Sequence, residues 1–242
     1  MSQILSAIAV VVFVAALHGP IRRHPAVFYL LAALVAVLGI CFTYNPSPAG
    51  AVRAAVFAVQ KGHIGFALLA VVMFVGVFDR ASGVRGALGP IRGQLSIMGA
   101  ILMLGHAVPY LANYLSMAGA LLSLKPTVQA SLCIAAVLLV LLGVLALTSI
   151  RAVHARMDAR SWKRVQLLAY PFFLLIFLHL LGYLLVPLAA GSTEILAGLG
   201  FYGAVLVSYL ALRARRFMLD RRSDAAEGPR FDAAAADAFK EA

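Results

Sequence analysis

The chain has 242 residues, of which 63% are hydrophobic and only 12% are charged, and its formal net charge is +11. A soluble domain of this length would carry about twice that share of charged residues, so the composition excludes an ordinary soluble enzyme. Because no nucleic-acid-binding motif accompanies the positive charge, we expect no nucleic-acid partner and assign the charge to the loops of a membrane protein.

Apolar runs long enough to cross a bilayer recur along the chain and predict an all-α, polytopic membrane helical bundle. We expect seven spans, at about 3–18, 26–43, 62–78, 94–115, 128–149, 165–187 and 196–213. The first is short, at roughly 24 Å, and a signal peptide is the alternative. No positive residue precedes it, and Arg22 and Arg23 follow it, so we expect a retained helix.

The distribution of lysine and arginine predicts the orientation. If the segments 18–25, 79–93, 150–164 and 213–242 face the cytoplasm, they hold 17 of the 20 basic residues, and only Arg53, Lys61 and Lys125 remain on the other side. The positive-inside rule then places the N-terminus outside and the C-terminus inside. We expect a multi-pass protein of the plasma or inner membrane, surrounded by the lipid bilayer.

Three regions follow from this arrangement. Residues 1–25 form an N-terminal transmembrane helix with a basic turn, 26–213 form the main bundle, and 214–242 form a flexible cytoplasmic tail. The loop 44–61 lies outside, and its second half, AVRAAVFAVQKG, has the composition of a short amphipathic helix at the interface.

Two of the six histidines, His106 and His179, lie deep inside apolar spans. An ionisable side chain there is costly and indicates a functional site with a partner. His106 follows Arg92 by 14 residues and His179 follows Arg164 by 15. Both spans run in the same direction, so at about 1.5 Å per residue the two imidazoles lie at one level, roughly 21–22 Å from the basic anchors.

Two neutral imidazoles at one level on two helices are typical of an iron held between them, as in haem b. The alternative is that each histidine forms a hydrogen bond across helices inside a haem-free permease or assembly scaffold. Gly99, Gly105 and Gly182 suit either the approach of a flat ring or ordinary helix packing. The absence of acidic residues from the spans disfavours a proton relay.

Several segments resemble a known family. They are KGHIGFALLAVVMFVGVFDR, the basic turn leading to His106 in GPIRGQLSIMGAILMLGHAVPYL, ALTSIR at 146–151, and the run of Trp162, Tyr170 and His179. From about residue 62 to 185, the chain is similar to the ferric reductase-like transmembrane domain. Within that family, it resembles the haem-binding membrane subunit that serves a methionine sulfoxide reductase.

The resemblance implies a six-helix core preceded here by an extra helix, with haem b carrying electrons across the membrane. Carried over, His106 and His179 are the axial ligands, and His63 is a weaker candidate for the haem environment. Members with two haems have a further histidine near position 166, where this chain has Gln166. We therefore expect a single haem in the outer half of the membrane.

The resemblance also implies redox partners. No FAD and NAD(P)H domain follows the last span, so we expect an electron-transferring component of an oxidoreductase that is not a self-contained NAD(P)H reductase. Its donor would be a cytoplasmic flavoprotein, a bound FMN or a membrane quinol, and its acceptor an extracytoplasmic redox partner. Lys61, Arg53 and Lys125 are the outer cations available to haem propionates, although solvated loop charges explain them equally well.

Overall fold

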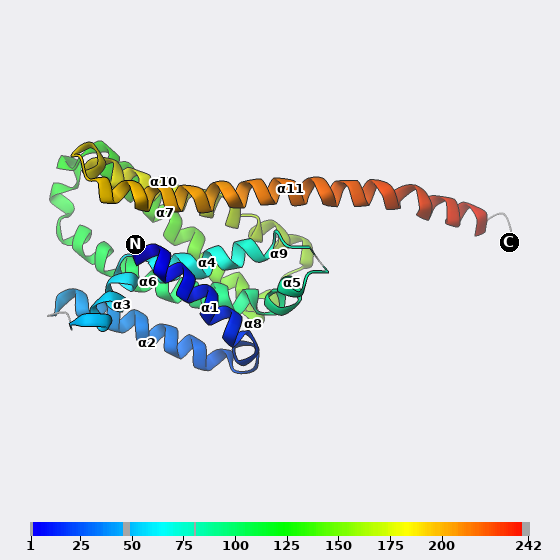
Figure 1. Cartoon of the computed structure of the whole chain (residues 1–242), viewed down its shortest axis with the longest axis horizontal. Coiled ribbons are helices and arrows are strands. Elements are labelled where there is room, and N and C mark those ends of the chain that lie inside the picture. The colour runs from blue at the N-terminus through cyan, green and yellow to red at the C-terminus, as the bar shows by residue number, and fades with distance from the viewer. Residues whose placement is uncertain (1, 46–48, 80, 239–242) are drawn as a thin grey trace.

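The structure, a computed structural model, describes residues 2–45, 49–79 and 81–238, and every regular element in these ranges is helical (Figure 1). The elements in chain order are α1 (Ser2–Arg23), α2 (Pro25–Tyr44), α3 (Gly50–Gln60), α4 (His63–Val75), α5 (Gly83–Leu88), η1 (Gly89–Ile91), α6 (Arg92–Ser116), η2 (Ala118–Ser123), α7 (Pro126–Ser149), α8 (Arg151–His154), α9 (Ala159–Gln166), α10 (Ala169–Ala189) and α11 (Thr193–Ala238). The predicted all-α polytopic bundle is confirmed.

Six helical stretches of the described chain are long and apolar enough to cross a membrane. The remaining expected span, 62–78, corresponds to α4, whose 13 residues cover only about 20 Å. It qualifies only together with α3, from which it is bent by 59°. The predicted amphipathic helix of the outer loop is α3, and the break between the two helices is Gly62 in the left-handed conformation, with φ of 72°.

The long helices run up and down, and α4 and α6 are the central pair. α6 packs against α2, α4 and α7, while α10 packs against α7 and α11. The largest core cluster joins α1, α2, α4 and α6 through buried residues such as Val14, Phe28, Leu68 and Leu95. A second cluster joins α4, α10 and α11 through Phe66, Phe173 and Tyr202. The N-terminal helix α1 is therefore an integral part of the bundle.

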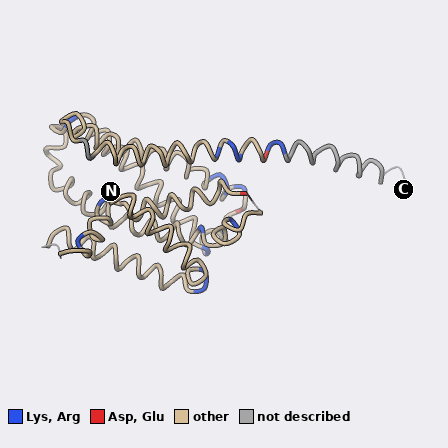
Figure 2. Tube along the Cα trace, viewed as in Figure 1, with Lys and Arg blue, Asp and Glu red and all other residues tan. Residues whose placement is uncertain are grey.

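Lysine and arginine gather at one end of the bundle, on the right in Figure 2. This arginine-rich end carries the α1–α2 turn and the helices α5, α8 and α9 (Figure 1). The opposite end carries α3 and η2. The separation agrees with the loop charges in the sequence, and the assignment of the arginine-rich end to the cytoplasm remains a prediction from the positive-inside rule.

Two helix boundaries differ from the predicted spans. The span expected at 165–187 lies within a longer helical stretch, Ala159–Ala189, which a short turn after Gln166 divides into α9 and α10. Asp158 caps α9 by accepting a hydrogen bond from the Ser161 amide at 2.9 Å. The last span continues as α11 to Ala238, through most of the segment 214–242 that we expected as a flexible tail. Arg216 pairs with Asp79 and Asp220 along this extension, and residues 239–242 lie outside the described ranges.

Candidate functional site

His106 on α6 is held by the end of another helix. Its Nδ1 lies 2.6 Å from the main-chain oxygen of Gln60, the last residue of α3. The final carbonyls of a helix have no partner within that helix and carry the negative end of its dipole. The imidazole of His106 supplies the missing donor, which fixes the orientation of the ring.

Gly62 makes this contact possible. The amide of Lys61 bonds back to Phe57 and that of Gly62 bonds to Val59, which closes α3 and turns the chain into α4. A Cβ on Gly62 would lie 3.3 Å from Cγ of His106, and the residue already has a positive φ that other residues rarely adopt. Glycine is therefore required twice at this position, by the turn and by the imidazole beside it.

His179 on α10 is held in the same way by α7. Its Nδ1 lies 3.0 Å from the main-chain oxygen and 2.9 Å from the hydroxyl of Ser131. The Ser131 hydroxyl in turn donates to the carbonyl of His179 at 2.8 Å. Ser131 is fully buried, and Gly182, one turn further along α10, lets the two helices approach so closely.

These contacts define the tautomers. A carbonyl oxygen only accepts hydrogen bonds, so Nδ1 must carry the proton in both rings. In a neutral imidazole the lone pair then resides on Nε2. Within the described part of the chain, the Nε2 atom of neither His106 nor His179 has a hydrogen-bond partner. Metal-binding histidines show the same arrangement, in which the second nitrogen donates to a carbonyl and the first binds the metal.

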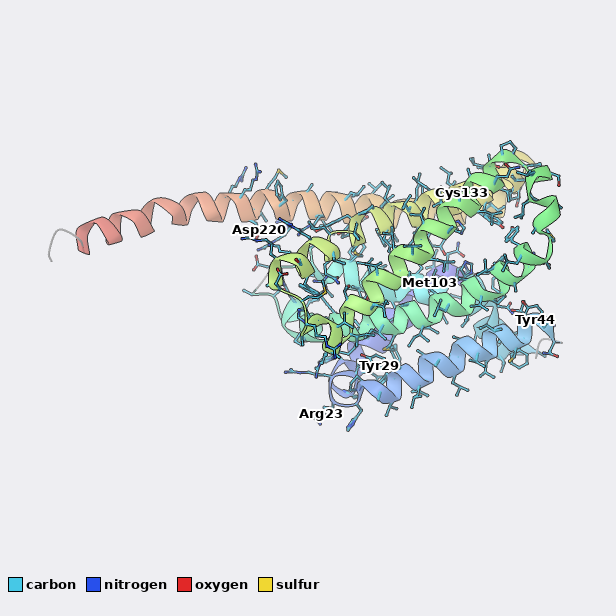
Figure 3. All side chains as sticks on the ribbon, turned by 180° about the vertical axis from the view of Figure 1, so that it is seen from behind. Arg23, Tyr29, Tyr44, Met103, Cys133 and Asp220 are labelled. Atoms are coloured by element: carbon cyan, nitrogen blue, oxygen red, sulfur yellow. The ribbon has the colours of Figure 1, made fainter. Side chains whose placement is uncertain are left out.

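The two histidines stand above one apolar layer. Met103 (labelled in Figure 3) and Ile176 precede them by three residues, and both pack on a cluster that joins α4, α6, α7 and α10. Residues three apart share a helix face, so both imidazoles follow this layer at a similar height. Both α6 and α10 pack on α7.

A tyrosine follows each histidine by four residues. Tyr110 lies with its ring centroid 5.0 Å from that of His106, and Tyr183 lies 5.8 Å from His179. Tyr110 accepts a hydrogen bond from Lys61 at 3.0 Å, whereas the buried hydroxyl of Tyr183 has no partner in the described structure. The repeated His-x-x-x-Tyr spacing is visible in the sequence and is the signal that would have identified both tyrosines.

His63, the weaker candidate, occupies a different position. It begins α4, its Nδ1 lies 3.5 Å from the hydroxyl of Ser2, and its ring contacts Phe57. Its neighbours therefore belong to α1 and α3, and among the described residues no carbonyl contacts its ring as those of Gln60 and Ser131 contact His106 and His179.

The three glycines that suited two interpretations are explained by helix packing. A Cβ on Gly99 would meet Leu69 of α4, one on Gly105 would meet Ala36 of α2, and one on Gly182 would meet Thr127 and Ser131 of α7, each at 3.0–3.1 Å. Such small-residue contacts are common between membrane helices. None of the three glycines provides evidence for a flat ring beside it.

At the arginine-rich end, residues from two of the resembling segments meet. The indole of Trp162 donates to the carbonyl of Thr148 at 3.1 Å, and the amide of Gln166 donates to the Thr148 hydroxyl at 3.0 Å. His154 contacts the Trp162 ring. Gln166 is therefore part of a hydrogen-bonded contact between α7 and α9.

Other candidates stand apart from this site. Cys41 and Cys133 are exposed free cysteines. The described residues contain no group of three or more histidine, cysteine, aspartate or glutamate side chains able to hold a metal ion. A bis-histidine haem requires no such group, because the porphyrin supplies the remaining four ligands.

The fold and the spans define a multi-pass, all-α membrane protein with two internally oriented histidines. The chain is similar to an uncharacterized protein of Treponema pallidum (strain Nichols), with 32% identity over 226 residues, or 92% of this chain. The match covers 62% of that protein, so this chain spans less than two thirds of its length. No protein-family model and no solved structure matches the chain. The resemblance to the ferric reductase-like domain stays a prediction.

Proposed function

We propose that the protein is a membrane-embedded electron-transfer subunit of an oxidoreductase that holds one haem b between His106 and His179. The observation that supports this proposal is the matched orientation of the two imidazoles. Each donates Nδ1–H to a main-chain oxygen on a different helix, from Gln60 or Ser131, and each leaves Nε2 without a partner among the residues that the structure describes.

This donor set fits a low-spin haem. His106 and His179 would supply the axial nitrogens, and the carbonyls of Gln60 and Ser131 would keep the rings in the required tautomer and increase their basicity. The unpartnered hydroxyl of Tyr183 is a further polar group beside His179. When bound, haem b supplies reversible one-electron chemistry, and the apolar surroundings contribute to its reduction potential.

One haem, and not two, agrees with the contacts of Gln166. Its amide is committed to the Thr148 hydroxyl, and glutamine is not a usual haem ligand. Electrons would enter from the arginine-rich end, from a flavoprotein, a bound FMN or a quinol, and leave toward an extracytoplasmic acceptor. Exposed cations on α9, such as Arg160 and Lys163, would favour an acidic donor protein.

The test is the absorption spectrum of the full-length protein purified from haem-replete cells. We expect a Soret band and sharp reduced-state bands of a bis-imidazole haem. His106→Ala and His179→Ala should each abolish the spectrum, while His154→Ala should retain it. His154 is the matched control because it is a histidine of the same chain whose ring contacts Trp162 at the arginine-rich end.

A haem-free permease or scaffold is the second candidate, and one observation favours it: each imidazole already has an internal hydrogen-bond partner. Folded wild-type protein that stays colourless, and whose thermal stability is the same with and without added hemin, would establish this alternative. The absorption spectrum of the purified protein therefore distinguishes the two functions.

A further inference from the structure

A cavity of about 550 Å³ opens at the arginine-rich end between α1 and α5. Its lining is His18, Gly19, Arg22, Arg23, Gly86 and Ala87. Arg23 lies at the α1–α2 turn (Figure 3). This site is separate from the two intramembrane histidines and belongs partly to the extra N-terminal helix.

The charge of this cavity is uncompensated. Neither Arg22 nor Arg23 forms a salt bridge with any carboxylate of the described residues, and no acidic residue lines the cavity. The Nδ1 of His18 is bonded to the carbonyl of Ala15 at 2.9 Å, which fixes the ring. Two guanidinium groups that have no ion-pair partner in the described part of the chain are suited to a phosphate, which each can contact through two parallel hydrogen bonds.

The glycines leave room for such a group. A Cβ on Gly19 or on Gly86 would meet nothing within 4 Å, so both positions border open space. Apolar residues of α1 are exposed on the helix face that leads away from the cavity: Ile8, Val12 and Ala15 share this face with Gly19. A ligand with a phosphate and an apolar chain would match both parts.

We propose that this cavity binds the head group of an anionic phospholipid, with the phosphate between Arg22 and Arg23 and an acyl chain along the exposed face of α1. Basic pockets between helices at the cytoplasmic side of a membrane are suited to such head groups. The bound lipid would connect α1 to α5 and thereby hold the N-terminal helix on the bundle.

The experiment uses the full-length protein in nanodiscs of phosphatidylcholine, alone or mixed with phosphatidylglycerol, and measures retained phosphatidylglycerol by mass spectrometry. At about 1 kcal/mol for each basic residue, Arg22→Gln with Arg23→Gln should weaken retention roughly thirtyfold. Arg160→Gln with Lys163→Gln removes the same charge at the same end, outside the cavity, and should leave retention near that of the wild type.

Gly86→Leu tests the cavity without any change of charge, because the added side chain enters the open space. It should also reduce retention of phosphatidylglycerol. Equal losses in the two double variants would overturn the proposal in favour of a general surface charge, and unchanged retention in Gly86→Leu would overturn it as well. Displacement of the lipid by inorganic phosphate would assign the cavity to a soluble phosphate compound instead of a lipid.

Discussion

Ser131 and His179 exchange hydrogen bonds across the interface of α7 and α10. The Ser131 hydroxyl lies 2.8 Å from the carbonyl oxygen of His179, and the Nδ1 of His179 lies 3.0 Å from the carbonyl oxygen of Ser131. A buried serine thus fixes both the backbone and the ring of an intramembrane histidine.

Ser131→Ala should weaken haem retention while leaving the fold intact. The alanine keeps the carbonyl acceptor but removes the hydroxyl, so the ring of His179 is less well oriented. Changes in groups that orient metal ligands typically cost about tenfold or more in affinity. Haem content after purification and the reduction potential are the measurements. Cys133→Ala, an exposed change on the same helix, is the control, and equal haem loss in both variants would contradict this role for Ser131.

Gly62→Ala should reduce haem content by more than the backbone strain at position 62 explains, because Gly62 also contacts His106. A non-glycine residue in the left-handed region costs about 1–2 kcal/mol, and the new methyl group would also press on the imidazole at 3.3 Å. Gly50→Ala is the matched control, because Gly50 has φ of 65° and nothing within 4 Å of its Cβ position. Thermal unfolding and haem content are compared. If the two variants lose the same amount of haem, the contact with His106 has no functional effect.

Thr148→Val should destabilise the arginine-rich end of α7. It removes the hydroxyl that accepts the hydrogen bond from Gln166 and leaves that amide unpaired. Hydrogen bonds between membrane helices contribute about 0.6 kcal/mol on average, and a double-mutant cycle with Gln166→Leu measures this coupling. Ser116→Ala, which removes an exposed local hydrogen bond, is the control. A coupling energy of zero would show that the hydrogen bond between Gln166 and Thr148 contributes nothing to stability.

Asp158→Ala should lower the thermal stability of α9 in a pH-dependent way. Hydrogen bonds from the side chain and the amide of Ser161 lower the pKa of the Asp158 carboxyl. The pKa of Asp158 is therefore lower in the folded chain than in the unfolded chain. The stabilisation is fully present at pH values above the ordinary aspartate pKa of about 3.9, and it is lost as the pH falls through the pKa of the folded state. Wild type and variant should therefore differ in unfolding temperature near neutral pH and converge in acid.

Asp158→Asn is the control for this prediction. Asparagine caps helices about as well as aspartate but does not titrate in this range. It should keep most of the stability at every pH. A wild-type advantage over Asp158→Ala that persists in strong acid would mean that the carboxylate form is not what caps the helix.

The local sequence determined the class of the protein and the course of most helices. Apolar runs must form helices in a bilayer, because every backbone polar group there needs an internal partner. Basic residues gather in the loops at one end, as the positive-inside rule expects for the cytoplasmic side. The amphipathic pattern of residues 50–60 likewise identified α3 before the structure. The sequence also placed the boundary between this helix and the next span near residue 62, but it gave no sign of the left-handed φ of Gly62 or of the 59° bend there.

Only the tertiary structure decided which groups orient the histidines. His106 and His179 stand out in the sequence because an imidazole inside an apolar span is costly. Their partners, the carbonyl of Gln60 and the buried Ser131, do not stand out, since every residue has a carbonyl and small polar residues are common in membrane helices. The two contacts join residues that are separated in the sequence by 46 and by 48 positions. They exist because the folded bundle brings a helix end and a close helix pair to the two imidazoles, a proximity that local periodicity does not encode.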